Sequence, residues 1–397
     1  MRKTTLDTFV PSSHFISFTL NTSMRIAILG TRGIPNHYGG YEQYAEFLAL
    51  RFAKRGHDVL VYNSHNHSYQ GSEWNNITII HMRDTEFKLG SVGRFIYNYK
   101  CIRDIRKQNC DIILQLDYST LSLWDFLLPK NSGIVTVFDS LKSKQVHHRK
   151  FMSLYLLFSE RLAVKFSNHL ISDSKNVADY LKEKFHRSST VIPSGADIFI
   201  NPNVDLLKFH QVLPFKYNML IAKLMPQDLI EVVLDGVVKA NLTSPFLVIG
   251  NPTTEYSLYL KEKYKDTAQI QFIGGMYNYS KRNNLRYFSN LCFYVNTTYS
   301  TNSLLVQAMA SSTLISTNTD KLTQEILGNN CLYYQNVDDV VLQLTTINKQ
   351  DEKYQMMLEK NRAKVRNFHN WDDILKLYEK DFGNVIENKY SLQLKKV

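Results

Sequence analysis

Short apolar runs rich in valine and isoleucine recur along the chain, separated by longer stretches in which apolar residues follow helical spacing. Continuous apolar runs of about four to eight residues predict parallel strands buried on both faces of a sheet. The first series of predicted strands covers residues 25–30, 58–63, 77–82, 111–116, 134–138, 169–172 and 190–193, and the second covers 218–224, 246–250, 270–274, 291–296, 313–317 and 331–334. Two series of strands alternating with helices predict two doubly wound α/β domains. Ligands of such domains bind beyond the carboxyl ends of the strands, so we expect a cleft between the two sheets.

The same pattern predicts where the domains begin and end. We expect a disordered N-terminal extension at residues 1–23, a first Rossmann-like domain at 24–200, a second at 201–370, and a C-terminal helix and tail at 371–397 that pack back towards the first domain. Pro202 and Pro214 punctuate the junction between the two domains. The last strong helical pattern covers residues 371–382.

The composition excludes several classes of protein. With 397 residues, 44% hydrophobic and 21% charged, the chain is neither disordered nor small. No apolar run approaches the roughly 18–20 residues that a membrane-spanning helix needs. The four cysteines form no Cys-x-x-Cys pair, which argues against a disulfide framework and a zinc site. We therefore expect a cytoplasmic protein.

The charge is unevenly distributed. Residues 1–200 hold 25 of the 47 Lys and Arg but 17 of the 36 Asp and Glu. Basic residues gather beside aromatic ones in one predicted helical stretch, at Lys88, Arg94, Lys100, Arg103, Arg106 and Lys107, and again just before the apolar helix 151–166, at Lys142, Lys144, His147, His148, Arg149 and Lys150. Such clusters suit docking on an anionic membrane surface, unless helix 151–166 belongs to the core. No nucleic-acid-binding module accompanies the charge, and adjacent histidines point to different faces of a helix, so neither nucleic acid nor a metal is expected.

The loop after the first strand carries the clearest chemistry. Gly30 and Gly33 allow the chain to turn, and Gly39 and Gly40 stand at the start of an amphipathic helix. The free N–H groups and the positive dipole end of a helix bind phosphate, and glycines allow a close approach. The dinucleotide fingerprint GxGxxG and the Walker lysine are both absent. The alternative is that these glycines only shape the turn.

Residues 30–42, which read GTRGIPNHYGGYE, resemble the first loop of bacterial retaining GT-B glycosyltransferases of the family 4 type, in their rhamnosyltransferase-like branch. The resemblance implies two Rossmann-like domains with a nucleotide-sugar donor in the cleft. It also implies a glycan or lipid-linked acceptor of capsule, O-antigen or wall synthesis, and transfer without a metal ion or other cofactor. On this resemblance Gly39 and Gly40 approach the donor diphosphate, and Glu42 caps the site.

Further likeness in the first domain covers residues 169–197. There Ser174 opens a helix, where we expect its hydroxyl to accept N–H bonds as a cap. Gly195 supports a tight turn near the donor side of the cleft. In residues 137–150 the family pattern is eroded, but Asp139 is retained, and the resemblance sets it beside the acceptor or the reacting sugar.

In the second domain, Lys223 stands where the family has an arginine that meets the donor phosphates. A lysine still neutralises diphosphate, although it lacks the bidentate fork of arginine. Thr301 and Asn302 of the donor-binding turn are retained, as is the later acid Glu325. Gln307 replaces the glutamate that would bind the donor ribose.

The sequence therefore predicts a GT-B glycosyltransferase, cytoplasmic and peripheral at the inner face of the plasma membrane, with Asp139 and Lys223 as its catalytic residues. The eroded donor motif leaves a second hypothesis open, a catalytically silent relative that acts as a nucleotide-binding or scaffold protein. A nucleotide-sugar epimerase of similar two-domain form is a third, but its acidic and histidine pairs are not found in the sequence.

Overall fold

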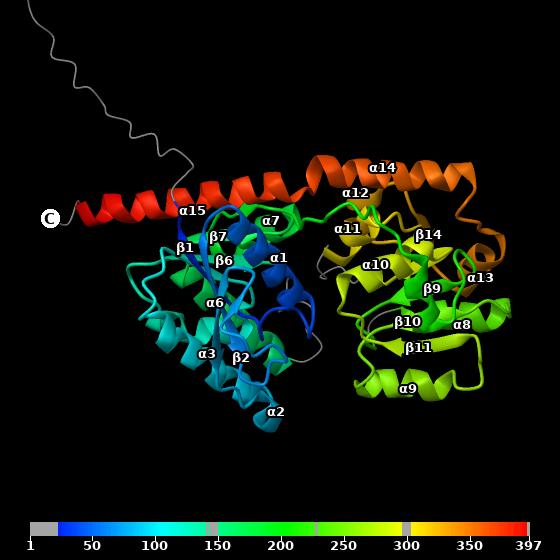
Figure 1. The fold of residues 1–397 in the computed structure, drawn as a ribbon, viewed down its shortest axis with the longest axis horizontal. Helices are drawn as coiled ribbons and strands as arrows, with labels where there is room; N and C mark the ends of the chain where they lie inside the picture. The colour runs from blue at the N-terminus through cyan, green and yellow to red at the C-terminus, as the bar shows by residue number, and fades with distance from the viewer. Residues whose placement is uncertain (1–22, 140–141, 143–149, 227–228, 296–302, 395–397) are drawn as a thin grey trace, which may run out of the picture.

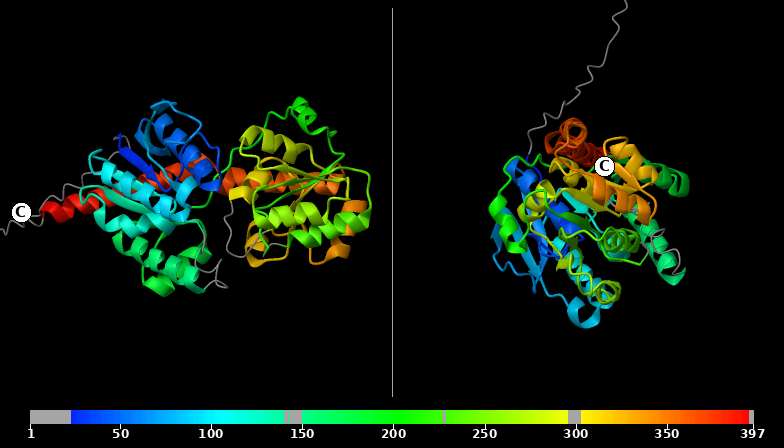
Figure 2. Two further views of the ribbon diagram at one scale, coloured as in Figure 1. Left: turned by 90° about the horizontal axis from the view of Figure 1, so that it is seen from below. Right: turned by 90° about the vertical axis from the view of Figure 1, so that its right-hand side faces the viewer.

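The computed structural model describes residues 23–139, 142, 150–226, 229–295 and 303–394. Two β-sheets lie side by side, each covered by helices on both faces (Figure 1). Figure 2 shows the two halves from below and from one end. The predicted α/β class with two Rossmann-like sheets is confirmed.

The first sheet has eight strands in the order β3-β4-β2-β1-β5-β6-β7-β8. The strands are β1 (Arg25–Leu29), β2 (Asp58–Ser64), β3 (Glu73–Trp74), β4 (Ile77–Met82), β5 (Ile112–Gln115), β6 (Gly133–Phe138), β7 (His169–Ser172) and β8 (Thr190–Val191). All neighbours pair in parallel except β3 and β4. The edge strand β3 was not predicted, because two residues are too few to show any periodicity.

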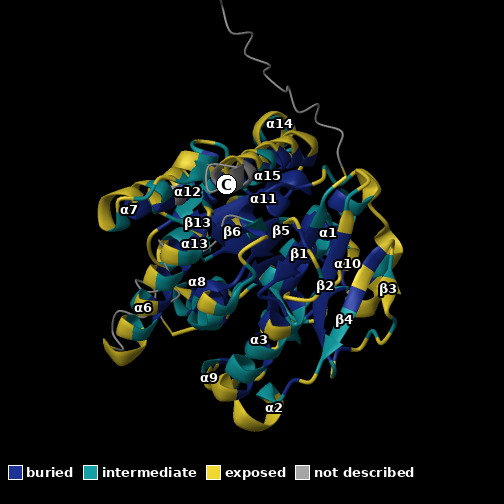
Figure 3. Cartoon of the chain, turned by 90° about the vertical axis from the view of Figure 1, so that its left-hand side faces the viewer, coloured by how far each residue is buried: buried dark blue, intermediate teal, exposed yellow. Residues whose placement is uncertain are grey.

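The second sheet has six parallel strands in the order β11-β10-β9-β12-β13-β14. The strands are β9 (Asn218–Ile221), β10 (Phe246–Ile249), β11 (Ile270–Gly274), β12 (Leu291–Tyr294), β13 (Ile315–Asn318) and β14 (Leu332–Tyr334). The central strands β9, β10 and β12 are buried along their whole length, as the continuous apolar runs predict. In the first sheet β5 and β6 are likewise buried throughout (Figure 3).

Helices on both faces complete the first half. They are α1 (Gly40–Lys54), α2 (Glu86–Leu89), α3 (Ser91–Ile105), α4 (Tyr118–Leu121), α6 (Lys150–Phe166) and α7 (Lys175–Phe185), with the 3-10 helix η1 (Ser122–Leu127). Apolar side chains of α1 pack on one face of the sheet together with those of α15 (Trp371–Leu394). Those of α3, α6 and α7 pack on the opposite face.

The second half is built in the same way. Its helices are α8 (Ile230–Ala240), α9 (Glu255–Lys263), α10 (Tyr279–Phe288), α11 (Ser303–Ala310), α12 (Lys321–Leu327), α13 (Val337–Thr346) and α14 (Glu352–Phe368), with the 3-10 helix η2 (Val204–His210). Helices α10 and α11 cover one face, and α8, α9 and α13 cover the other.

The chain passes between the two halves at two places that are bonded to each other. On the way out, Ala196 N donates to His369 O at 2.9 Å, and on the way back the ring of His369 contacts Ser194 O through Nδ1 at 2.9 Å. Helix α15 then lies along the first half, in red in Figure 1, while α14 lies along the second. The first half is therefore assembled from both ends of the described chain.

Several predicted elements differ from the observed ones. The last helix does not stop at residue 382 but continues to Leu394. The basic stretch 88–107 is two helices, α2 and α3, because Gly90 between them has a φ of 55°. Ser174 is the N-cap residue of α7, but its side chain makes no capping hydrogen bond, so that prediction was wrong. The predicted extension 1–23 lies outside the described residues up to residue 22, as do residues 143–149 of the second basic cluster.

Candidate functional site

The first loop begins at the carboxyl end of β1, where two glycines have left-handed backbones. Gly30 has a φ of 92° and lies against Asp117, since a Cβ there would stand 2.5 Å from Asp117 N. Gly33 has a φ of 127° and lies against the side chain of Asn63, which donates to Ile34 O and accepts from Ile34 N. A side chain at either glycine would be strained and crowded, so these two glycines shape the loop.

The glycines at the start of α1 are different. Gly39 is the N-cap residue with an extended backbone that any residue adopts, and a Cβ on Gly40 would meet nothing within 4 Å. The first turn of a helix carries N–H groups that have no partner within the helix. The start of α1 is thus an open, positively polarised backbone surface that suits an anion.

Glu42 does not face this opening freely. Its side chain is buried, and Oε1 accepts a hydrogen bond from Arg32 N at 3.1 Å. The guanidinium of Arg32 lies 3.9 Å from the same oxygen and forms a closer, bidentate pair with Glu86. Glu42 therefore holds the first loop against α1.

A buried charge cluster lies beyond the ends of β5 and β6. The carboxylate of Asp117 accepts from Lys142 Nζ at 2.5 Å and from Arg94 at 3.0 Å. Burial by itself raises the pKa of Asp117, but the charges of Lys142 and Arg94 outweigh burial and hold this pKa below its usual range. Lys142 Nζ also lies 4.5 Å from the ring centroid of Tyr41 and 4.6 Å from that of Tyr118. Asp117 stays ionised because two cations pair with it, and two aromatic rings hold one of those cations, Lys142, in place.

Asp139 follows β6 directly and is held by α1. Its Oδ1 accepts a hydrogen bond from the hydroxyl of Tyr41 at 2.8 Å. Burial raises the pKa of Asp139, and the positive charges of Lys142 and of Lys223 partly oppose that rise. Lys223 belongs to the second sheet, where it follows β9 and is exposed. The two predicted catalytic residues thus interact electrostatically across the domains.

Gln307 lies where the two domains touch. It is fully buried on α11, and its Oε1 accepts a hydrogen bond from Arg282 at 2.8 Å. The same Arg282 nitrogen donates to Oε1 of Gln43 on α1 at 2.7 Å. Burial, followed by the charge of neighbouring Arg286, lowers the pKa of Arg282 to about 9, and no carboxylate among the described residues pairs with it. The side-chain amide of Gln307 therefore makes hydrogen bonds to other side chains of the protein, at the place where the two domains touch.

The remaining predicted residues are Gly195, Glu325, Thr301 and Asn302. Gly195 lies against the indole of Trp371 at the crossing between domains, where a Cβ would stand 2.6 Å from a ring atom. Glu325 is exposed on α12. Thr301 and Asn302 lie outside the described residues.

Sequence reasoning missed Asp117, Tyr41, Arg282 and Asp173. Asp173 carries the same signal as Asp139, an acidic residue directly after a buried strand, and Asp117 follows the end of β5 by two residues. Nothing in the sequence around Arg282 indicates a functional residue, since an arginine in a polar helical stretch is expected to be exposed.

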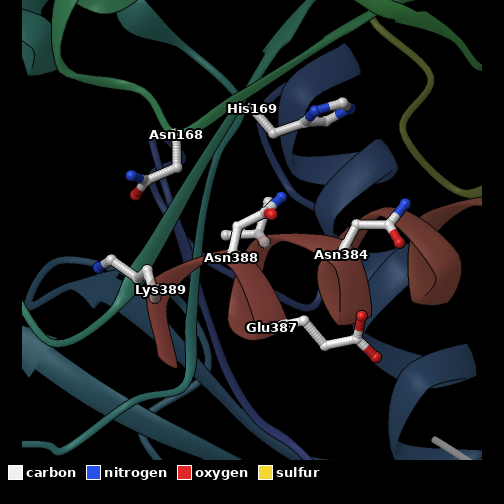
Figure 4. Close-up of a pocket in the computed structure, with 7 residues that line it drawn as sticks. Asn168, His169, Asn384, Glu387, Asn388 and Lys389 are labelled. Atoms are coloured by element: carbon white, nitrogen blue, oxygen red, sulfur yellow. The ribbon is translucent and has the colours of Figure 1, made fainter. Parts of the chain in front are cut away.

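Two further observations bear on cofactors. Among the described residues, no group of three or more His, Cys, Asp or Glu side chains is arranged to hold a metal ion. A cavity of about 450 Å³, shown in Figure 4, is lined by Asn168, His169, Asn384, Val385, Glu387, Asn388 and Lys389. It lies at the amino end of β7 beneath α15, at the opposite end of the sheet from Asp139.

No helix in the described part of the chain is long and apolar enough to cross a membrane.

Solved structures of GT-B glycosyltransferases share this fold. Sucrose-phosphate synthase from Thermosynechococcus elongatus is 16% identical, with 93% of this chain and 100% of that one covered at a TM-score of 0.72. HepE of Anabaena, solved with UDP and glucose, is 14% identical over 91% of this chain and 99% of its own at a TM-score of 0.69. WaaG is described as a glycosyltransferase involved in lipopolysaccharide biosynthesis. It is 14% identical, with 91% of this chain and 99% of its own covered at a TM-score of 0.65. The fold is GT-B.

A sequence match narrows the class. Residues 38–198 match the family described as Glycosyltransferase Family 4, a stretch that begins just before α1 and ends after β8. No curated protein matches the chain in sequence. Fold and family match together support a GT-B glycosyltransferase.

Proposed function

We propose that the chain is a retaining glycosyltransferase that moves a hexose, with rhamnose as one candidate, from a nucleoside diphosphate sugar to a polysaccharide or lipid-linked oligosaccharide of capsule, O-antigen or wall synthesis. One observation carries the proposal. The open start of α1, the half-buried Asp139 and the exposed Lys223 face the same inter-domain region, and Lys223 acts electrostatically on Asp139. Two positive groups from opposite domains suit the diphosphate of a donor.

In this proposal each group has one task. The backbone at Gly39 and Gly40 and the ammonium of Lys223 stabilise the diphosphate as negative charge builds on it during departure. Asp139 accepts the proton of the acceptor hydroxyl, since Tyr41 orients its carboxylate and burial raises its pKa above the usual range, which makes it a better base. The protein supplies these positive groups itself, which favours a reaction without a metal ion or other cofactor.

The identity of the donor is the next question. HepE was solved with UDP and glucose, and a similar trehalose-phosphate synthase from Burkholderia xenovorans is described as UDP-forming. Uridine diphosphate sugars are therefore the first donors to test, with thymidine diphosphate rhamnose beside them because of the rhamnosyltransferase-like first loop.

Calorimetric titration with UDP, UDP-glucose and thymidine diphosphate rhamnose tests the proposal. We expect a nucleotide to bind, and Lys223→Ala to weaken that binding about tenfold, since a charged hydrogen bond is worth roughly 1.5–3 kcal/mol. Lys360, which is exposed on α14, supplies the matched control Lys360→Ala, which should bind as the wild type does. Failure of the whole panel to bind would reject the donor site.

A second candidate function is a GT-B relative that no longer transfers sugar and serves as a nucleotide-binding or scaffold protein. The observation in its favour is the bonding of Gln307 to Arg282 and Gln43, because those polar atoms would otherwise serve the donor ribose. Nucleotide binding without release of nucleoside diphosphate from any tested donor would select this alternative.

We propose further that the protein docks on the inner face of the plasma membrane through α6. One face of this helix presents Phe151, Leu154 and Phe158, which are 91%, 63% and 54% exposed, with Lys150 and Arg161 along the same stripe. The alternative of a core helix fits only its other face, which is buried against η1 and the sheet. Apolar side chains flanked by cations suit an anionic bilayer. A lipid-linked acceptor would be met at such a surface.

A further inference from the structure

Two aspartates end neighbouring strands of the first sheet. Asp139 follows β6 and Asp173 follows β7, and the two strands pair in parallel with Phe138 opposite Ser172. The hydrogen bond from Asp173 N to Phe138 O, at 3.1 Å, continues this ladder by one residue. Side chains alternate along a strand, so both carboxyls point to the face of the sheet that α1 and α15 cover.

The two carboxyls are not equivalent. Asp139 accepts a hydrogen bond from the hydroxyl of Tyr41, whereas Oδ1 of Asp173 is buried and accepts none. Asp173 is only 7% exposed. An ionised carboxylate is very unfavourable in such a place unless it is paired, whereas a protonated carboxyl is tolerated.

Among the described residues, both neutral and charged groups act on the pair, and the hydroxyl of Ser174 hydrogen-bonds to the carboxyl of Asp173. Helix α1 contributes the hydroxyls of Tyr41 and Tyr44, and α15 contributes Tyr378, whose hydroxyl lies 2.8 Å from that of Tyr44. The cations Lys142 and Lys223 and the carboxylate of Asp117 act on Asp139. Burial raises the pKa of Asp173 well above its usual range, and the charge of Asp139 raises it further. The cations thus favour a negative charge on Asp139, and the proton stays on Asp173.

We propose that Asp173 is a positioning residue for the transfer: it keeps one proton between the two strand ends, so that Asp139 alone is ionised and ready to take the proton of the acceptor hydroxyl. This inference rests on the proposed function. In the step itself the acceptor oxygen bonds to the anomeric carbon from the face on which the donor phosphate leaves, so that the configuration is retained, and the bond from that carbon to the phosphate breaks. The bonding electron pair leaves with the nucleoside diphosphate, and the hydroxyl proton goes to Asp139. A second charge on Asp173 would repel both Asp139 and the diphosphate, so the step should fail when Asp173 loses its proton.

The first test needs no substrate. Carboxyl carbon NMR of the full chain labelled at aspartate should show one carboxyl that ionises at a higher pH than all the other aspartates, and Asp173→Asn should remove that resonance. The exposed Asp179 on α7 supplies the matched control, since Asp179→Asn should leave it in place. A wild-type spectrum in which no aspartate ionises at a higher pH than the exposed ones would overturn the proposal, even if Asp173→Asn fails to fold.

Stability gives a second readout with a defined sign. A carboxyl whose pKa is raised on folding contributes stability that is full below its unfolded pKa, about 3.9, and is lost as the pH rises towards the folded value. Asn cannot ionise, so Asp173→Asn should gain in melting temperature over the wild type as the pH rises from 4 to 8. A variant equally destabilised at every pH would show a structural role only.

The third readout is the pH profile of the transfer. We expect the alkaline limb of kcat to disappear in Asp173→Asn while nucleotide affinity stays within twofold. Asp139→Asn should instead lower kcat by about 10²–10⁴-fold at every pH. An unchanged alkaline limb in Asp173→Asn, with nucleotide binding intact, overturns this role alone. Failure to bind any nucleotide overturns the proposed function and this role with it.

Discussion

Gln307→Glu places a carboxylate against an arginine that has none. In the structure Arg282 is 5% exposed and Gln307 is fully buried, and the guanidinium donates to two neutral amide oxygens, those of Gln307 and Gln43. The change keeps the size of the side chain and the position of the accepting oxygen. It adds the counter-charge that the described surroundings of Arg282 lack.

The magnitude follows from the difference between two kinds of hydrogen bond. A bond between charged partners contributes roughly 1.5–3 kcal/mol, against about 0.5–1.5 kcal/mol for a neutral one. Burying the carboxylate opposes the gain, but its partner is already buried and positioned at 2.8 Å. We expect a net stabilisation of about 1 kcal/mol, or a rise of roughly 2–4 °C in the melting temperature of a domain of this size. Gln307→Leu, which removes the acceptor, should destabilise by about 1–3 kcal/mol.

Differential scanning calorimetry with a double-mutant cycle checks the reasoning. In an Arg282→Met background, Gln307→Glu leaves a buried carboxylate without its cation and should lower the melting temperature. Gln324→Glu, on the exposed face of α12, is the matched control and should change stability by less than about 0.5 kcal/mol. If Gln307→Glu destabilises the wild type as much as it destabilises Arg282→Met, a carboxylate at position 307 gains nothing from Arg282 and the reasoning is refuted.

Three further predictions follow from other parts of the molecule. A chelator should leave nucleotide binding and transfer unchanged, because the protein supplies its own positive groups; loss of activity that a divalent cation restores would contradict this. The double change Phe151→Ser and Leu154→Ser should weaken binding to anionic vesicles at least tenfold in a sedimentation assay, since burying each side chain contributes up to roughly 1.5–3 kcal/mol. Phe209→Ser, which alters a side chain 73% exposed in the second half, is its control, and equal effects of both changes would argue against docking through α6. Gly195→Ala should destabilise by about 1–3 kcal/mol in urea unfolding, because a methyl group there meets a packed indole, and an unchanged midpoint would show that the indole moves aside.

The succession of strands and helices along the chain could be predicted from the sequence, because parallel strands buried on both faces appear as continuous apolar runs. Ile112–Gln115 and Phe246–Ile249 show this plainly, since every residue in them is buried. The length of α15 was underestimated. Beyond residue 382 the apolar spacing weakens, and the contacts of the buried Val385 and the partly buried Ile386 with the core of the first half are revealed by no local pattern.

The candidate site was predicted less completely, for a different reason. Asp139 and Lys223 were predicted from the resemblance to the glycosyltransferase family. The side chains that set their properties come from α1 and from the charged stretch after β6, and such contacts depend on tertiary packing. Gln307 shows that the position of a residue in the sequence does not determine its partner. It stands where a residue that binds the donor ribose was expected, but its side-chain oxygen accepts a hydrogen bond from Arg282, 25 residues earlier. Pairing between distant polar side chains leaves no trace in a local pattern.

The return of α15 to the first half has a consequence for how the protein is made. Trp371, Tyr378 and Phe382 are buried in the same core as β1 and α1, so the half that is synthesised first cannot complete its interior until the last helix has left the ribosome. At about 5–20 residues per second, the roughly 200 residues between β8 and that helix take on the order of 10–40 s. Throughout that interval a sheet face lies without its final cover, whereas by its end every strand of the second sheet has been synthesised. The later half of the chain should therefore reach its native state first, and the earlier half would be the natural client of a chaperone.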